Sequence, residues 1–530
     1  MTNEYYSGPF KKPKMKSISE LQPTILTIFG GDGDLTRRKL IPALYNLYID
    51  GFLPGKFKIL SVDQRDVSQD DYNKRHYEGV NQFSRRGKAD KEKWKEFEQY
   101  ITYVQADITN NKSYNQLKSI FSDIDKEWKV EASRIFYMAV SPNFIEVLAN
   151  HLNKAGIAGN SEKHRIVVEK PFGHDLESAK NLNKVLQGIF SESQIYRIDH
   201  YLGKETVQNL MAFRFANALF EPLWNRNFIQ QIQITVSENV GVENRAAYYE
   251  QAGAVRDMIQ NHILQLICLI GMEPPVDLQA NSVRDKKLEV LHAIRHFSED
   301  NVYVNAVRGQ YDKGWIEGNK VKAYREEDNI NKESLTETFA ALRFFIDNWR
   351  WQGVPIFVRT GKRLQETTSY ITIQFKEVPH KIFPSGVREL VHPNLMVISI
   401  QPQMGIRIHF QAKKTGLDMQ LKPVDMIFNY SDSYSNDPPD AYETLLNDVM
   451  LGDATLFMRS DQIEESWSII MPILDVWASN PPQKFPNYPS GSWGPPEAEA
   501  LIAHDGFYWH TFTEPLDINP NAPSLAKKQS

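Results

Sequence analysis

Cysteine is almost absent from the sequence. Cys268 is the only one among 530 residues, which excludes a disulfide within the chain and leaves no set of thiolates for a cysteine-based zinc site. Because Cys268 lies in the apolar run 263–270, we expect a buried and chemically inert thiol.

Long apolar runs and a strong charge of one sign are also missing. No apolar run reaches the roughly 18 residues that a membrane span needs, and the start, MTNEYYSGPFKKPK, lacks the apolar core of a signal peptide. The net charge is only -5, so no global basic field favours nucleic acid. The basic run at 11–16 lies in a Pro-containing stretch, and we expect residues 1–22 to form a disordered tail. These features predict a cytoplasmic protein with no nucleic-acid or membrane partner.

The first half of the remaining chain alternates between two patterns. Short β-branched runs at 24–29, 57–62, 101–105, 134–139, 165–169 and 195–198 are separated by amphipathic helical stretches. Strand–helix alternation is typical of an α/β domain with a doubly wound parallel sheet. The sequence therefore predicts such a domain over residues 23–198.

The second half reads differently. Ile232, Ile234 and Val236 alternate with polar residues, and further strands are expected at 339–346, 370–375, 395–400 and 406–410. A period of two indicates an antiparallel sheet with one buried face. Helical patterns at 257–270 and 441–451 are expected to cover that sheet, and the Pro-, Gly- and Ser-rich stretch 481–496 to be an extended loop. Residues 199–530 thus read as an α+β domain.

A glycine-rich turn follows the first predicted strand. The order Gly30-Gly31-Asp32-Gly33-Asp34-Leu35 is succeeded by a helical pattern. Such glycines let the backbone approach a pyrophosphate, which the free N–H groups of the following helix can bind. The spacing is not the full G-x-G-x-x-G, and a turn without ligand is the competing interpretation. Its place on the first strand of a doubly wound sheet favours dinucleotide binding.

Three further segments gather polar side chains where strands end or helices begin. Lys170 ends one strand, and Asp199, His200, Tyr201 and Lys204 follow another. Imidazole, phenol and ammonium groups together suit a phosphate monoester.

The third segment, Asp257–His262, opens an apolar helix. A histidine on an apolar stripe is commonly a core residue, but a partly buried histidine beside a carboxylate also suits a general base for an alcohol. The residues alone leave both interpretations open.

Taken together, these segments resemble the glucose-6-phosphate dehydrogenase family. The segment Arg197–Glu205 matches the family signature without a mismatch, and Glu169–Gly173, Arg256–His262 and Arg359–Lys362 are similar to other family motifs. The motifs occur in order over residues 24–510. The resemblance implies a Rossmann domain followed by a β+α domain with a large, mostly antiparallel sheet. It also implies a homodimer or homotetramer.

The resemblance further implies the reaction and the residues that perform it. D-glucose 6-phosphate would be oxidised to 6-phospho-D-glucono-1,5-lactone, the first step of the oxidative pentose phosphate pathway, with hydride transfer to NAD(P)+ and no metal. His262 would be the general base and Asp199 would orient it. The substrate would be held by Lys170, His200, Tyr201, Lys204, Glu238, Asp257, Lys362, Gln401 and Lys39. The cofactor would be held by Gly30, Gly31, Asp32, Gly33, Asp34, Leu35, Gln64, Arg65, Pro142 and Lys170.

Two departures from the family pattern stand out. Thr367 occupies a position where many relatives carry a basic substrate contact. At the cofactor end, Asp32 replaces a Ser, Thr or Lys, and Gln64 replaces an arginine after the second strand. An acid near that strand end, here Asp63, is the usual partner of a free ribose 2′-hydroxyl, whereas Arg65 could instead bind a 2′-phosphate. NADP is the family cofactor, and use of NAD or of both is equally consistent with these residues.

Two other functions fit parts of the sequence. Sugar dehydrogenases of the Gfo/Idh/MocA type share the domain layout and an E-K-P lysine, but non-phosphorylated sugars need no site like 199–204. A dinucleotide sensor without catalysis would keep the glycine turn and lose the base, whereas His262 and Asp199 are both present.

Overall fold

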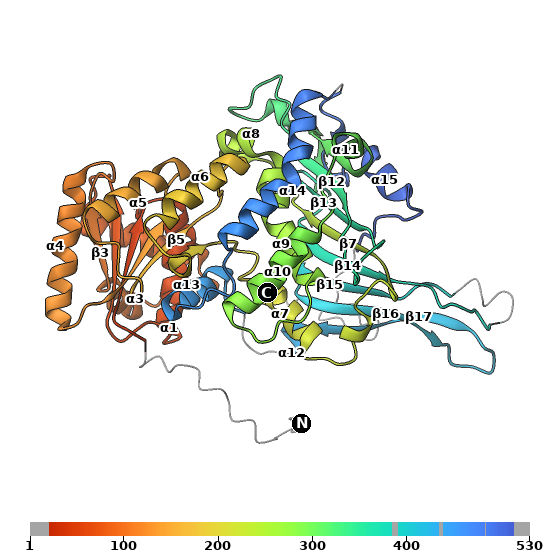
Figure 1. Ribbon diagram of the computed structural model, residues 1–530, viewed down its shortest axis with the longest axis horizontal. Helices are drawn as coiled ribbons and strands as arrows, with labels where there is room; N and C mark the ends of the chain where they lie inside the picture. The colour runs from red at the N-terminus through yellow and green to blue at the C-terminus, as the bar shows by residue number, and fades with distance from the viewer. Residues whose placement is uncertain (1–20, 384–390, 434–437, 483, 513–530) are drawn as a thin grey trace, which may run out of the picture. The chain divides into compact units, whose positions relative to one another are not determined.

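The computed structural model describes residues 21–383, 391–433, 438–482 and 484–512. It divides into two compact units (Figure 1). Unit 1 contains the described residues up to Lys170 together with Asn181–His200 and Pro439–Phe457, and unit 2 contains Pro171–Lys180, Tyr201–Pro438 and the described residues from Met458. Residues 1–20 of the predicted tail lie outside the described residues.

Unit 1 is built on a six-stranded parallel sheet. The strand order is β3-β2-β1-β4-β5-β6, formed by β3 (Ile101–Gln105), β2 (Phe57–Asp63), β1 (Thr24–Phe29), β4 (Ser133–Met138), β5 (His164–Val168) and β6 (Ile195–Arg197). All pairings are parallel, which confirms the prediction. Every residue of β1 is buried, as expected for a central strand covered on both faces. The strand order reverses between β1 and β4, where α/β sheets bind ligands.

The helices of unit 1 alternate with these strands. α4 buries the stripe Tyr114, Leu117 and Phe121, spaced as one face of a helix requires, and it packs on α5. The helical segments are η2 (Thr36–Leu40), α1 (Ile41–Ile49), α2 (Gln69–Phe83), α3 (Lys91–Glu98), α4 (Asn111–Trp128), η3 (Pro142–Phe144), α5 (Ile145–Lys154), α6 (Leu176–Gln187), which contains a unit boundary, η4 (Glu192–Gln194) and α13 (Ala441–Leu451).

α13 was expected to cover the antiparallel sheet, and that prediction is wrong. The helix packs on α1 and belongs to unit 1. Asn46 on α1 donates a hydrogen bond to Glu443 at 2.8 Å, and Arg85 forms an ion pair with the same carboxylate at 2.9 Å. These buried contacts, made by residues about 360 to 400 positions earlier in the chain, hold the late segment in the first unit.

Unit 2 contains an eight-stranded sheet. The order is β17-β16-β15-β14-β7-β13-β12-β8, formed by β17 (Leu421–Asn429), β16 (Gly405–Lys413), β15 (Leu395–Gln401), β14 (Thr368–Phe375), β7 (Ile229–Ser237), β13 (Ile356–Gly361), β12 (Phe339–Phe344) and β8 (Ala306–Gly309). The pairs are antiparallel except for β7 with β13. The mostly antiparallel sheet is therefore confirmed, while β8, β13 and β17 were not predicted.

Helices and short strands complete unit 2. The predicted helix 257–270 is present, but its first part is the π-helical segment η7 (Val255–Ile263), followed by α9 (Leu264–Gly271). Cys268 is fully buried, and this burial raises the pKa of its thiol to about 12. The other elements are α7 (Glu205–Phe215), η5 (Glu221–Leu223), η6 (Glu243–Arg245), α8 (Ala246–Ala254), α10 (Ala280–Ala293), α11 (Glu299–Asn305), β9 (Tyr311–Asp312), β10 (Gly314–Ile316), β11 (Asn319–Val321), η8 (Tyr324–Glu326), α12 (Tyr430–Ser433), α14 (Ser460–Ser479), β18 (Tyr488–Pro489) and α15 (Pro496–Ala503).

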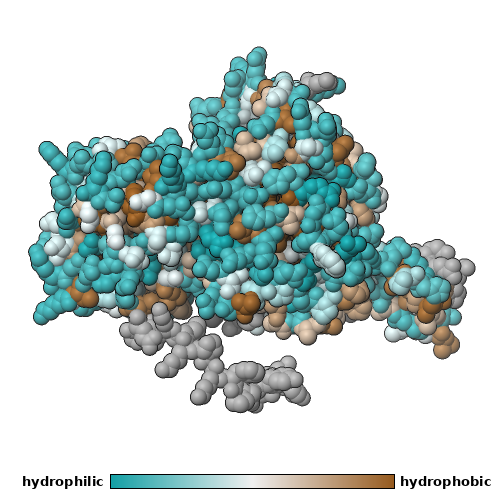
Figure 2. All heavy atoms as spheres, in the orientation of Figure 1, coloured by the Kyte–Doolittle hydropathy of each residue, from teal (hydrophilic) through white to brown (hydrophobic). Residues whose placement is uncertain are grey.

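In the described part of the chain, no helix is both long enough and apolar enough to cross a bilayer. On the face drawn in Figure 2, hydrophilic residues predominate and apolar residues are scattered among them, which is usual for a folded protein in water.

Candidate active site

The glycine turn of unit 1 forms a tight cradle at the end of β1. Gly30 has a φ of +85°, and a Cβ added there would lie 2.2 Å from the carbonyl oxygen of Ala139. A Cβ on Gly31 would lie 2.7 Å from the carbonyl carbon of Ser61. Gly33 donates to the carbonyl of Gly30 at 3.0 Å, and its own carbonyl accepts from the backbone N–H of Arg37 on η2 at 3.0 Å. The backbone therefore has the close approach and the helix start that a dinucleotide pyrophosphate requires.

The carboxylate of Asp32 in this turn is paired with two arginines. It is fully buried, and its Oδ2 accepts from Arg65 at 2.9 Å and from Arg75 on α2 at 2.8 Å. Its backbone N–H donates to Asp63 at the end of β2 at 3.1 Å. The nearby His76 adds no charge, because burial lowers its pKa to about 3. Two acids and two arginines therefore balance one another beside the cradle.

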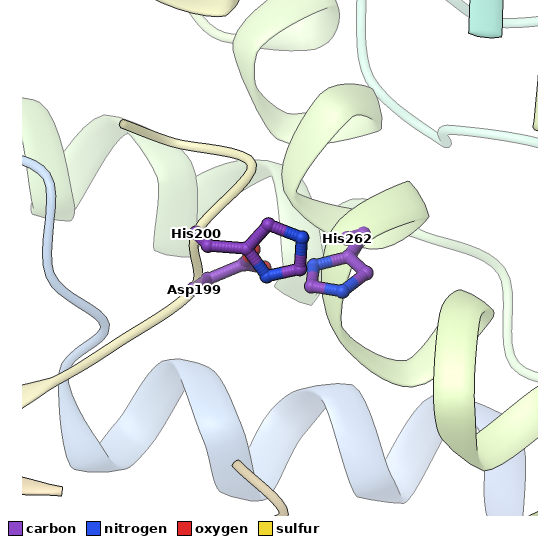
Figure 3. Close-up of side chains that lie close together, drawn as sticks. All are labelled: Asp199, His200 and His262. Atoms are coloured by element: carbon purple, nitrogen blue, oxygen red, sulfur yellow. The ribbon is translucent and has the colours of Figure 1, made fainter. Parts of the chain in front are cut away.

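The other strand ends of unit 1 carry the predicted polar residues. Lys170 follows β5, and Asp199 and His200 follow β6. Figure 3 shows Asp199 and His200 on that loop and His262 on a helical turn, η7. Asp199 is buried and His200 is half-buried. Because the carboxyl ends of parallel strands share one edge of the sheet, Lys170, Asp199 and His200 lie on the same edge of the unit 1 sheet as the glycine cradle.

Four predicted residues of unit 1 have simpler surroundings. Gln64 and Pro142 are exposed after β2 and β4, and Asp34 pairs with Arg38 at 3.5 Å. Lys39, on η2, forms an ion pair with Asp440 at 3.0 Å, and both side chains remain partly exposed. Lys39 thus has a carboxylate partner within unit 1.

In unit 2, the strand register brings the predicted residues together at one end of the large sheet, where β7, β13 and β15 end and β14 begins. Ser237 of β7 is opposite Gly361 of β13 and Thr368 of β14, and Ser369 is opposite Gln401 of β15. The residues that follow β7 and β13, Glu238 and Lys362, form an ion pair at 2.7 Å. Lys362 is only 6% exposed, whereas 35% of the Glu238 side chain is exposed, so only the lysine of this pair is shielded from solvent.

The ring of Tyr201 contacts both His262 and Lys204. Its ring stacks on that of His262 with centroids 4.3 Å apart, and the ammonium of Lys204 lies 3.9 Å from the centroid of the same ring. Lys204 also donates to Gln401 at 2.6 Å. A histidine, a tyrosine, a lysine and an amide thus form one continuous array within unit 2.

The segment η7 carries both His262, which belongs to this array, and Asp257. His262 is fully buried, and Asp257 is 3% exposed. Asp257 accepts from the hydroxyl of Tyr248 at 3.2 Å, and the guanidinium of Arg245 is 3.7 Å from it. π-helical turns are rare and frequently occur at functional sites.

Sequence reasoning missed several residues of these arrays. Arg75 and Arg245 stand in no short motif, and only their contacts with Asp32 and Asp257 in the folded chain reveal them. At the predicted departure, Thr367 donates to Asn239 at 2.7 Å, so neighbouring polar groups satisfy its hydroxyl.

A parallel sheet with a glycine cradle at its switch point, joined in sequence to an antiparallel sheet with a histidine and cation array, defines a Rossmann-type oxidoreductase. Comparison with known families gives the particular one. The family models described as "Glucose-6-phosphate dehydrogenase, NAD binding domain" and "Glucose-6-phosphate dehydrogenase, C-terminal domain" match residues 27–209 and 211–510. The chain belongs to the glucose-6-phosphate dehydrogenase family.

Individual relatives agree with this assignment. The glucose-6-phosphate 1-dehydrogenase of Bacillus subtilis is 42% identical over 92% of this chain and 98% of its own length. A solved glucose-6-phosphate dehydrogenase in complex with its substrate glucose-6-phosphate is 36% identical, with a TM-score of 0.84 over 92% of this chain and 99% of the other. The enzyme from Mycobacterium avium is 35% identical, with a TM-score of 0.79 over 93% of this chain and all of the other.

Proposed function

We propose that His262 is the general base in the reaction of this family, and that Asp199 orients its imidazole. This enzyme oxidises D-glucose 6-phosphate to 6-phospho-D-glucono-1,5-lactone, with transfer of a hydride to NAD(P)+. The observation that carries the assignment is Tyr201, whose ring contacts both His262 and Lys204. One side chain therefore supports the proposed base and the proposed phosphate-binding cation.

The proton and the sugar are handled by the residues of the chain. His262 takes the proton from the C1 hydroxyl, and the Asp199 carboxylate stabilises the imidazolium that forms. Bound nicotinamide supplies the hydride acceptor for C1. Lys170, after β5, is proposed to lie against both the sugar and the dinucleotide. The buried surroundings of His262 exclude water from the proton that is transferred.

The remaining contacts fix the substrate. Lys204, with its charged hydrogen bond to Gln401, is proposed to hold the phosphate together with His200 and Tyr201. Glu238, Lys362 and Asp257 are proposed to bind the sugar hydroxyls. Their ion pairs and hydrogen bonds hold these side chains in place before the substrate arrives.

The direct test is an absorbance assay of nicotinamide reduction, with glucose 6-phosphate and glucose compared side by side. We expect turnover with the phosphorylated sugar and at least ~100-fold lower kcat/KM with glucose, since each charged hydrogen bond to phosphate is worth about 1.5–3 kcal/mol. Equal activity on the two sugars would assign the Tyr201–Lys204 array to another role.

We further propose that the enzyme uses both NADP+ and NAD+, with a modest preference. The outer N–H groups of Arg65 and Arg75 are available to a 2′-phosphate, since about half of the Arg65 side chain and 39% of the Arg75 side chain are exposed. Asp32 draws on the same two cations and so weakens their attraction for a phosphate. Asp63 offers a carboxylate for a free 2′-hydroxyl.

The cofactor proposal predicts the effect of Asp32→Asn. This isosteric change removes the counter-charge, so the ratio of kcat/KM for NADP+ over NAD+ should rise by about 10-fold, and Arg75→Ala should lower it by a similar factor. Asp347→Asn, which breaks an exposed arginine pair in unit 2, is the control. A native preference for NADP+ above ~100-fold that Asp32→Asn leaves unchanged would refute the electrostatic argument.

The eight-stranded sheet is the proposed surface for self-association into a dimer or tetramer. β17 is an edge strand among the described residues, and Met426 and Ile427 on it are 55% and 41% exposed. Exposed apolar side chains on an edge strand are a surface that proteins commonly cover. Light scattering of the purified chain measures the oligomer mass directly.

A further inference from the structure

One carboxylate beside the proposed site has no part in the mechanism above. Glu169 lies between the end of β5 and Lys170, and its Oε1 accepts a hydrogen bond from the Tyr137 hydroxyl at 2.5 Å. Tyr442 on α13 donates a second hydrogen bond to the same carboxyl group. Side chains from β4, the end of β5 and α13 therefore meet in a Tyr–Glu–Tyr clamp, defined as Tyr137, Glu169 and Tyr442.

The third member of the clamp is rigidly anchored. Asp440 caps the start of α13 by accepting from the backbone N–H of Tyr442 at 3.0 Å, and it is the residue paired with Lys39. Glu443, the next residue along the helix, is bound by Asn46 and Arg85. Tyr442 is thus held on both sides by contacts to η2, α1 and the loop after α2.

The clamp lies between two residues that are proposed to bind the substrate. The rings of Tyr442 and His200 are nearly parallel, with an angle of 10° and centroids 6.5 Å apart. On the other side, Glu169 is adjacent in sequence to Lys170, whose positive charge stabilises the Glu169 carboxylate. The clamp therefore adjoins both positions, Lys170 through Glu169 and His200 through Tyr442.

The charge of Glu169 depends on these neighbours. Burial of the carboxyl group raises the pKa of Glu169 to about 7, although part of the residue stays accessible to solvent. The two phenols and Lys170 lower this pKa, and Asp199 at the end of β6 raises it. Burial raises the pKa values of Tyr137 and Tyr442 far above neutrality, and Asp440 adds to the effect on Tyr442. The phenols therefore remain donors throughout the pH range of the enzyme.

We propose that Glu169 is a positioning residue for the reaction: held by Tyr137 and Tyr442, its carboxylate fixes Lys170 and, through the Tyr442 ring, His200 in the orientation that binds the substrate. The inference rests on the proposed roles of Lys170 and His200. The ionised form is the active one, because protonation removes the negative charge beside Lys170. Catalytic efficiency should therefore fall as the pH drops through the titration of Glu169.

The test is the pH dependence of kcat/KM for glucose 6-phosphate between about pH 5.5 and 9. Glu169→Gln keeps the shape of the side chain and removes its charge. We expect a loss of about 10-fold or more at pH 8 and one ionisation fewer on the acidic limb. Tyr442→Phe and Tyr137→Phe each remove a donor to the carboxylate, which raises the pKa of Glu169 and moves the acidic limb upward by roughly one pH unit.

Tyr114→Phe is the matched control, since Tyr114 is a buried tyrosine of unit 1 whose hydroxyl donates only to the backbone of Ile108 among the contacts described. It should leave the pH profile unchanged.

The wild-type enzyme is assayed first, and absence of turnover would overturn the proposed function rather than this inference. With turnover present, a wild-type profile in Glu169→Gln overturns the positioning role. The positioning role is also overturned if Glu169→Gln lowers kcat/KM equally at every pH and lowers the Tm. It is overturned as well if both phenylalanine variants have the same pH profile as Tyr114→Phe.

Discussion

At the scale of single residues, His262 has a role that sequence pattern alone left open. It lies on an apolar stripe and is fully buried, as a core histidine would be, yet its ring stacks on Tyr201 in the array that contains Lys204. A purely structural histidine needs no such neighbours. The contact with Tyr201 therefore favours catalysis over packing, and two substitutions separate these roles.

His262→Asn should abolish turnover while sparing substrate binding. Loss of a general base typically costs about 10²–10⁴-fold in rate, whereas asparagine keeps part of the ring volume and a polar atom. The measurement is kcat together with the dissociation constant of glucose 6-phosphate. His296→Asn, which breaks an exposed pair with Glu465, is the control and should keep near-normal activity. A similar kcat in the two variants would remove His262 from the chemistry.

Lys204→Ala should raise the KM for glucose 6-phosphate and leave the KM for the dinucleotide nearly unchanged. A charged hydrogen bond to phosphate is worth about 1.5–3 kcal/mol, or roughly 10–150-fold in affinity. Steady-state kinetics with each substrate varied in turn measure both constants. Lys286→Ala, at an exposed helical pair on α10, should change neither. If the cofactor KM rose instead, Lys204 would belong to the dinucleotide site.

At the scale of elements, the junction before η7 controls the placement of His262. Gly253 has a φ of +63° and a ψ of -178°, a conformation available almost only to glycine. A Cβ there would lie 2.3 Å from the Glu337 carboxylate, which accepts from the backbone N–H of Val255 at the start of η7. Glu337 occupies the space that a side chain would need, and in doing so it anchors the first turn of the segment.

Gly253→Ala should therefore lower both stability and activity. Backbone strain costs about 1–3 kcal/mol, and displacement of Glu337 adds to it. Because η7 carries Asp257 and His262, kcat should fall even in the fraction that remains folded. Gly318→Ala is the control, since Gly318 has a φ of +78° but open space around it. Thermal unfolding and kcat of both variants are compared, and equal effects would show that strain alone matters.

At the scale of the whole molecule, the two units are not simply successive stretches of chain. Residues 439–457 return to unit 1, where α13 contributes Tyr442 and Glu443 to buried contacts. The helical pattern of 441–451 correctly indicates a helix and its apolar face. It cannot indicate which of two sheets that face covers, because either partner buries the same apolar area.

The sequence by itself determined the two sheet types, the order of the motifs and the glycine turn after β1. These features depend on local periodicity and on residue types that are close in the chain, so they can be read without knowledge of partners. Resemblance to the family supplied the candidate roles of His262, Asp199 and Lys204. The parallel pairing of β7 with β13 and the π-helical form of η7 were not visible, because each depends on contacts across the fold.

Tertiary structure alone decided the state of the charges. Asp32 reads in the sequence as an acid beside a cofactor phosphate, but Arg65 and Arg75 neutralise it from positions 33 and 43 residues away. Glu169 reads as the residue before a functional lysine, but Tyr137 and Tyr442 surround it. The free energy of a charge depends on its burial and on the groups within a few ångströms, and only the folded chain brings those groups together.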